Sequence, residues 1–363
     1  MKKLDWYILK KYFTTFFFSI TLFTIIAVVI DISEKTDDFV QSGLNAYQIF
    51  TQYFAGFIPH IAALLFPLFV FIAVIYFTSK MAGRSEVIAI LASGTSFRRM
   101  MVPYWVGGIV LSSMLWLANQ FIIPRANEIR TTFEVKYVLA NSTYNPLVAK
   151  SSNIYRRLDA NTYAGVHYYD TVQRTGGPFF IHTVKGNKLT YNLRAESFKW
   201  DSTVQRWTLL NVVERVVNKD EEKVSFTQMK QMAFNFKPFD LSRDDYAKDR
   251  LTTPELDRFI QLEELRGAEG LNALKVERYR RDATSVSVLI LTLIGVCISA
   301  RKVRGGSGVH LAIGFGIAAL FIITDRFSTV FSTKGNFSPL VAAWIPNIIF
   351  SLVAYYLYRK APK

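Results

Sequence analysis

The chain has 363 residues, of which 51% are hydrophobic, 15% aromatic and 20% charged, and its formal net charge is +15. So large an apolar fraction excludes an ordinary single soluble domain, because the apolar residues are concentrated in uncharged stretches. Nucleic-acid binding is also a poor interpretation of the charge, since the basic residues are scattered between these stretches and form no single patch.

Six stretches lack Asp, Glu, Lys and Arg, and each has close to the roughly 20 residues that a helix needs to cross a bilayer. A charge at the centre of such a helix costs roughly 2.5–3.5 kcal/mol on insertion scales, so the absence of charge predicts six spanning helices. The second stretch exceeds one crossing, and we expect residues 39–52 to lie outside the membrane or at its interface. The stretches are 13–30, 39–79, 100–124, 283–300, 305–324 and 335–358.

Basic residues predict the orientation, because Lys and Arg are enriched in cytoplasmic loops. With six spans both termini lie on one side, and that side carries fourteen basic residues against two acids, Asp5 and Glu86. The short loops opposite carry three basic residues against five acids. We therefore predict a multi-pass membrane protein with cytoplasmic N and C termini.

Residues 83–95, GRSEVIAILASGT, follow the second span and predict a short amphipathic helix on the cytoplasmic side. Ser85 suits the N-cap, Gly94 suits the C-terminal stop, and Glu86 falls in the first turn, where the helix dipole favours an acid. The apolar face consists of Val87, Ile88, Ile90 and Leu91. Glu86 either stabilises the helix locally or pairs with an Arg or Lys of a partner whose groove receives the helix.

Residues 125–282, between the third and fourth spans, have a different character. From Tyr163 onward apolar and polar residues alternate in segments separated by turn signals, which predicts antiparallel strands in a sandwich or barrel. The apolar side of such a sheet forms either a closed core or a surface for lipid chains. After Pro254 the period becomes helical, so we predict a helical linker over residues 254–282.

The last part of the chain, residues 283–363, holds spans four to six. Gly308, Ala312 and Gly316 lie four residues apart in the fifth span, where small residues permit close helix approach. No phosphate-binding loop occurs, because GGSG at residues 305–308 lacks the lysine, so any ATP hydrolysis is expected elsewhere. The four histidines, which we do not expect to bind metal, are His60, His167, His182 and His310.

The segment RSEVIAILASGTSFRRM strongly resembles the stretch after the second span in the LptF/LptG family of lipopolysaccharide export permeases. The family pattern is close to R-S-E-[LIV]-x-x-[LM]-x-A-S-G, and the resemblance extends over nearly the whole chain. The residues do not decide between an F-type and a G-type subunit, and we favour the G-type. Matching positions are Arg84, Ser85, Glu86, Val87, Leu91 (displaced by about one place), Ala92, Ser93 and Gly94.

The resemblance implies one permease subunit of an ATP-driven ABC transporter that extracts lipopolysaccharide and passes it to a periplasmic bridge toward the outer membrane. The implied partners are a second permease, giving an LptF/LptG heterodimer, a cytoplasmic LptB ATPase dimer that uses ATP and Mg²⁺, and an LptC-like single-span protein. No cofactor, metal or nucleic acid is expected on this chain. Implied coupling residues are Arg84, Ser85, Glu86, Val87, Ile90, Leu91, Ser93 and Gly94.

The implied domains are membrane helices at 1–124 and 283–363, a coupling helix at 84–95, a periplasmic β jelly roll at 125–253 and a periplasmic helical linker at 254–282. In this family spans one and five line the lipid cavity and form the subunit interface and lateral gate. Gly308, Ala312 and Gly316 are the gate and packing candidates here.

Lipid-contact candidates are Lys35, Arg326 and Asp31, although solvated or interfacial charge is the plainer interpretation of these residues. The family uses bases near the outer end of span one, whereas here Lys35 is the only base among four acids. Asp31 is expected to reach water or headgroups. Either the partner subunit supplies the cations, or divalent metal bridges the phosphates, or the lipid carries fewer phosphates.

Two other functions stay open at this point. The chain could be a permease of another ATP-driven lipoprotein or efflux system, although such permeases usually have four spans and a different extracytoplasmic fold. It could also be a membrane assembly protein without transport activity, which would have no ATPase partner.

Overall fold

The computed structural model describes residues 2–138, 151–170, 173–186, 188–217, 222–241, 246–265, 270–301, 307–335 and 337–361. The chain divides into two compact units, which we describe separately. A helical unit comprises Met1–Thr131, Lys248–Leu256 and Asn272–Lys363, and a β unit comprises Thr132–Ala247 and Asp257–Leu271.

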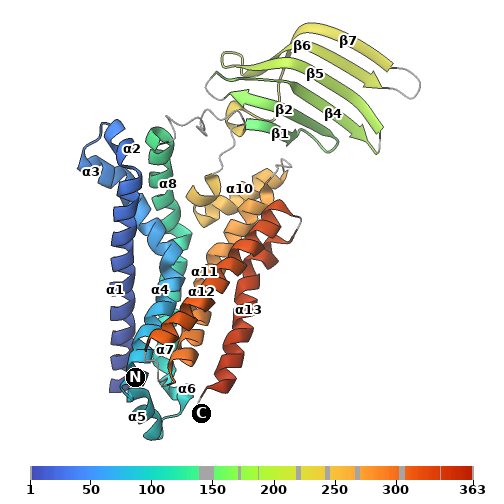
Figure 1. The fold of residues 1–363 in the computed structure, drawn as a ribbon. Helices are drawn as coiled ribbons and strands as arrows, with labels where there is room; N and C mark the ends of the chain where they lie inside the picture. The colour runs from blue at the N-terminus through green and yellow to red at the C-terminus, as the bar shows by residue number, and fades with distance from the viewer. Residues whose placement is uncertain are drawn as a thin grey trace. The chain divides into compact units, whose positions relative to one another are not determined.

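Among the described residues, six helices are long and apolar enough to cross a membrane, which confirms the six predicted spans (Figure 1). The third span consists of four consecutive helical segments. The spans are α1 (Lys3–Glu34), η1 (Phe50–Phe54) with α4 (Ala55–Gly83), α7 (Val102–Leu117) with η2 (Ala118–Ile122), α8 (Ile123–Phe133) and η3 (Glu134–Val138), α11 (Leu271–Ser299), α12 (Ser307–Lys334) and α13 (Pro339–Lys360).

Short helices occupy the connections between these spans. The helix α2 (Thr36–Gln41) lies across the start of the long second uncharged stretch, whereas α3 (Ala46–Ile49) runs directly into η1 and α4. At the other end of the unit, α5 (Glu86–Ala92) and α6 (Phe97–Met100) join α4 to α7. The N and C termini lie at this same end, as an even number of spans requires (Figure 1).

The core of the helical unit is aromatic where α1 meets α4, α7 and α11. Tyr12 and Tyr104 are almost fully buried, and the Tyr12 hydroxyl lies 2.9 Å from Thr292 Oγ1. Gly107 makes this approach possible, because a Cβ there would lie 2.6 Å from the Tyr12 ring. Gly56 of α4 has the same role beside α8, where a Cβ would lie 2.3 Å from a backbone carbonyl oxygen.

The β unit contains a seven-stranded antiparallel sheet inserted between the third and fourth spans, which confirms the predicted fold class. Its order is β1-β2-β3-β5-β6-β7, with β4 paired to β2 and β5. A cis Gly177–Pro178 bond separates β3 from β4. The strands are β1 (Ser151–Arg157), β2 (Thr162–Asp170), β3 (Thr175–Gly176), β4 (Phe179–Lys185), β5 (Lys188–Asp201), β6 (Arg206–Val217) and β7 (Glu222–Met232).

Trp207 stands at the centre of the β unit's core. It is fully buried, its indole Nε1 donates to the Phe236 carbonyl at 3.1 Å, and its ring contacts Tyr169 and Phe198. The alternation that predicted strands left open whether the apolar side forms a closed core or a lipid surface. In β6 the buried Trp207 and Leu209 are two residues apart, as one face of a strand requires, and the spacing becomes three at Val212, where Asn211 interrupts the pairing with β5. Aromatic side chains therefore make up the part of the β unit's core around Trp207.

Helical structure continues past residue 125, where the β domain was predicted to begin, as far as Val138. After the sheet come η4 (Pro238–Leu241), α9 (Ala247–Arg250) and α10 (Thr253–Leu265). The second half of the predicted linker is the first part of α11, which runs without a break into the fourth span.

Candidate functional site

The segment predicted to couple to an ATPase forms a compact helix, α5, directly after a sharp turn. Ser85, in the N-cap position, has a left-handed backbone (φ 61°) and makes no side-chain capping bond, so its predicted capping role is wrong. A left-handed conformation is strained for a residue with a Cβ, and it reverses the chain between α4 and α5. Gly94, with φ 82°, ends the helix as predicted.

The apolar face of α5 is directed into the protein's own core. Val87 is 1% exposed and belongs to the main cluster of the helical unit, against which Ile90 and Leu91 also pack. Ile88, in contrast, is 49% exposed. The surface that α5 offers to a partner therefore centres on Ile88 and on the exposed residues Arg84, Ser93 and Gly94.

Glu86 is bound within the chain. Its Oε2 accepts a hydrogen bond from the Tyr7 hydroxyl at 2.9 Å and lies 3.4 Å from Lys11 Nζ, both on α1. These side chains are about one third exposed, so the pair is accessible to water and to a competing partner. Glu86 also keeps its predicted place in the first turn of α5.

A second ion pair joins the segment of α5 and α6 to α1. The guanidinium of Arg99, on α6, donates to both carboxylate oxygens of Asp5 at 2.8 and 2.7 Å. Asp5 is only 2% exposed, and this two-bond geometry is the strongest form of such a pair. The α5–α6 connection is thus tied to the start of α1 at both of its ends.

No local sequence pattern indicates these contacts, because 94 residues separate Asp5 from Arg99 and 75 separate Lys11 from Glu86. Both acids nevertheless stood out as the two acids on a basic side. An acid isolated among bases is a reason to look for an ion pair, although its partner cannot be read from spacing.

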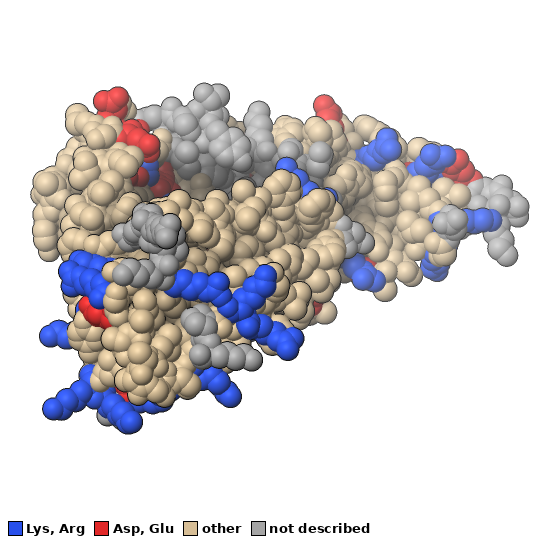
Figure 2. Space-filling view, turned by 60° about the horizontal axis from the view of Figure 1, so that its bottom comes forward, with Lys and Arg blue, Asp and Glu red and all other residues tan. Residues whose placement is uncertain are grey.

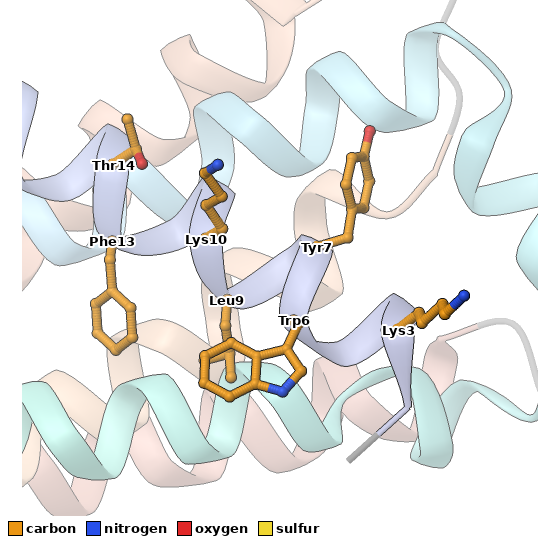
Figure 3. Close-up of a pocket in the computed structure, with 7 residues that line it drawn as sticks. All are labelled: Lys3, Trp6, Tyr7, Leu9, Lys10, Phe13 and Thr14. Atoms are coloured by element: carbon orange, nitrogen blue, oxygen red, sulfur yellow. The ribbon is translucent and has the colours of Figure 1, made fainter.

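Basic side chains gather at the end of the helical unit that carries α5 (Figure 2). A shallow apolar groove lies along the start of α1 at this end, and it is lined by α1 residues alone. Figure 3 shows Trp6, Leu9 and Phe13 on one side of α1, with Tyr7 and Lys10 on the other. Trp6 is 66% exposed, so the start of α1 presents an aromatic surface beside bases.

Two lipid-contact candidates at the opposite end of α1, Lys35 and Asp31, form an ion pair with each other. Lys35 Nζ lies 3.1 Å from Asp31 Oδ1, to which the Tyr53 hydroxyl also donates at 3.1 Å, and Lys35 lies over the Tyr53 ring. Asp31 is 7% exposed, so the expectation that it reaches water is wrong. The cluster satisfies Lys35 internally instead of presenting a free cation to a phosphate.

Two of the six spans are covered least by the rest of the described chain. The most apolar windows of α1 and of the fifth span, Gly308–Lys334, are 11% and 17% buried, against 33% to 61% in the other four. In the fifth span Gly308, Ala312 and Gly316 are exposed, and a Cβ on either glycine would have no described neighbour within 4 Å. This stripe of small residues is open to another helix.

Arg326, the remaining lipid-contact candidate, is exposed on α12 beside Asp325. It lies far along the chain from Lys35, and among the described contacts none joins it to Asp31, Lys35 or Tyr53. Among the residues that the structure describes, no group of three or more His, Cys, Asp or Glu side chains could hold a metal ion.

Comparison with known proteins identifies the family to which this chain belongs. The family model of the lipopolysaccharide export system permease LptF/LptG matches residues 6–360. The lipopolysaccharide export system permease protein LptG of Escherichia coli strain K12 is 21% identical over 364 residues, covering 98% of both chains, and the LptG of E. coli O6:H1 strain CFT073 matches to the same extent. A match over the full fold, with six spans and an inserted antiparallel domain, shows that this chain belongs to the LptF/LptG permease family.

Proposed function

We propose that this chain is one permease subunit of an ATP-driven ABC transporter that extracts lipopolysaccharide from the inner membrane. The match of the family model to residues 6–360 carries the proposal. The subunit would release the lipid to a periplasmic bridge toward the outer membrane, and we favour a G-type role, in agreement with the names of the two relatives.

A second permease subunit completes the proposed transporter. The poor coverage of α1 and α12 supports this step, because a helix so little buried in its own chain needs lipid or another protein around it. The stripe of Gly308, Ala312 and Gly316 suits the close approach of a partner helix. The lipid cavity would form between the two subunits, with α1 and α12 as its walls and its lateral gate.

A cytoplasmic LptB-like ATPase dimer would drive the cycle through α5, using ATP and Mg²⁺ that this chain does not bind itself. The exposed residues around Ile88 would enter a groove of the ATPase. The pairs Glu86–Lys11 and Asp5–Arg99 would then transmit the movement of α5 to α1, which lines the cavity. Contact of Glu86 with a base of the ATPase is the alternative role for this carboxylate, which is accessible to a competing partner.

Orientation follows from the charges in this proposal. The basic end with α5 and both termini would face the cytoplasm, and the β domain would face the periplasm. There it would meet the bridge and an LptC-like partner. Since Lys35 is paired with Asp31, the cations for lipid phosphates would come from Arg326, from the second subunit or from bridging divalent metal.

The test is reconstitution of this chain, its second permease and the ATPase in proteoliposomes loaded with lipopolysaccharide. We expect ATP-dependent transfer of the lipid to a soluble acceptor domain of the bridge. Transfer of a lipoprotein instead would favour the efflux alternative. Stable purification of the chain without any ATPase would favour an assembly protein without transport.

A further inference from the structure

A cavity of about 320 Å³ lies inside the helical unit, between α4, the third span, α11, α12 and α13. One part of its wall is charged and includes Asp249, Glu277, Arg280 and Asp325. The rest is apolar, with Leu64, Leu68, Leu291 and Phe321 among its residues. A cavity divided in this way suits an amphiphilic molecule more than water alone.

Two buried side-chain amides in this wall have oxygens that accept no hydrogen bond from the described residues. Asn127 and Asn347 are 6% and 4% exposed, and the Oδ1 atom of each has no hydrogen-bond partner among the residues that the structure describes. Their nitrogens donate to the backbone oxygens of Asp249 (3.0 Å) and Ala283 (2.7 Å), which fixes which end of each amide is the oxygen. An occupant that donates hydrogen bonds would satisfy both, since a buried acceptor left unpaired is costly.

The charged groups of the cavity occur in both signs. Three carboxylates, from Asp249, Glu277 and Asp325, line it together with three guanidinium groups, from Arg280, Arg281 and Arg326. Glu277 is held by Arg280 at 2.6 Å, and Arg281 donates to Thr253 and to backbone oxygens. An occupant carrying one sign alone would leave the opposite groups uncompensated, so a zwitterion fits this balance best.

The position of these charges along the helices is that of lipid headgroups. Glu277 and Arg280 come just before the uncharged stretch 283–300 of α11, and Asp325 and Arg326 come directly after the stretch 305–324 of α12. Both pairs of charged residues therefore lie at the edge of the hydrocarbon layer. The apolar side chains lie deeper, and Leu64, on the cavity wall, is 49% exposed, so the cavity has a lipid-accessible side.

We propose that this cavity binds a phospholipid with a phosphoethanolamine headgroup, as a resident lipid distinct from the exported one. The primary ammonium donates to the side-chain oxygens of Asn127 and Asn347 and to Asp325. The phosphate accepts from Arg280, and the acyl chains follow the apolar wall past Leu64. The proposal concerns a site within one chain and does not depend on the proposed export activity.

The ammonium makes the proposal specific, because the choline headgroup has the same charges but no N–H to donate, and glycerol headgroups have no positive charge. The experiment incorporates the purified transporter into nanodiscs of equal phosphatidylethanolamine, phosphatidylcholine and phosphatidylglycerol, followed by release into detergent and native mass spectrometry. We expect phosphatidylethanolamine to be retained about tenfold over phosphatidylcholine, from two to three donated bonds to buried acceptors.

Two variants locate the retained lipid. Asp325→Asn removes the charge that pairs with the ammonium, and Leu64→Trp fills the cavity from its exposed side without burying a charge. Each should lower retention of phosphatidylethanolamine about tenfold, whereas Asp37→Asn, an exposed acid away from the cavity, should leave retention unchanged.

Equal retention of phosphatidylethanolamine and phosphatidylcholine would overturn the proposal, as would preferential retention of phosphatidylglycerol. So would retention that persists in both variants. Loss of lipid transport in the reconstituted system, with the headgroup preference intact, would count against the proposed function alone.

Discussion

Glu86 is the residue at which docking and internal coupling can be separated. The change is Glu86→Lys, which removes the bond from Tyr7 and turns the pair with Lys11 into a repulsion. At 3.4 Å the pair would be strong if buried, but both side chains are about one third exposed. Screening reduces such a pair to about 0.2–1 kcal/mol. With the lost hydrogen bond from Tyr7 and the new repulsion added, Glu86→Lys should weaken the contact between α5 and α1 by about 1.5–2 kcal/mol. This corresponds to roughly a tenfold or somewhat larger change in the equilibrium constant of that contact.

The assay measures two rates on the reconstituted transporter, ATP hydrolysis and ATP-dependent release of lipopolysaccharide. In Glu86→Lys we expect release to fall about tenfold while ATPase assembly and hydrolysis persist, because the α5–α6 connection loses one of its two ion pairs with α1. The exchanged pair, Lys11→Glu with Glu86→Lys, rebuilds the ion pair in reverse and should recover most of the release. Lys10→Glu with Glu86→Lys carries the same net charge at a position that makes no bond to Glu86, and should recover none.

The outcome that refutes this reasoning is specific. If the exchanged pair is as defective as Glu86→Lys, and the ATPase no longer copurifies with either, Glu86 acts by contact with a base of the ATPase. The tie to α1 would then be incidental to coupling.

Gly316→Leu should leave the single chain folded, because no described residue lies within 4 Å of a Cβ at that position, yet reduce copurification of the second permease. Gly56→Ala, whose Cβ would lie 2.3 Å from a backbone oxygen, should instead lower the yield of the chain itself. Trp207→Ala should destabilise the β unit by about 3–5 kcal/mol, seen as faster limited proteolysis between its strands in the full chain, whereas a mild effect would mean that the core recloses. Burial, followed by the charge of Arg194, lowers the pKa of His182 below its ordinary 6.5. The unfolded chain therefore takes up the proton first, and stability should fall as pH drops through about 6.5, less so in His182→Gln; an identical pH dependence in both proteins would exclude His182 as the cause.

The predicted site was partly recoverable from sequence. The motif located α5, and Gly94 terminates the helix as its residue type suggests. The prediction that the Ser85 side chain caps α5 was wrong, because a suitable residue type does not ensure capping geometry. The reversal of the chain after α4 imposes a left-handed backbone at Ser85. The amphipathic pattern of α5 was correct, but it did not say whether the apolar face meets a partner or the chain's own core, and Val87 lies in that core.

Sequence by itself determined the six spans, the basic side, the inserted strands and the family, because hydrophobic length, charge content and alternation are properties of short contiguous segments. Only the tertiary structure decided the partners of Glu86 and Lys35, the exposure of α1 and α12, and the cavity with two unpaired amide oxygens. These features bring together residues from separate helices. Their contacts depend on how those helices pack, and no local pattern in the chain encodes that packing.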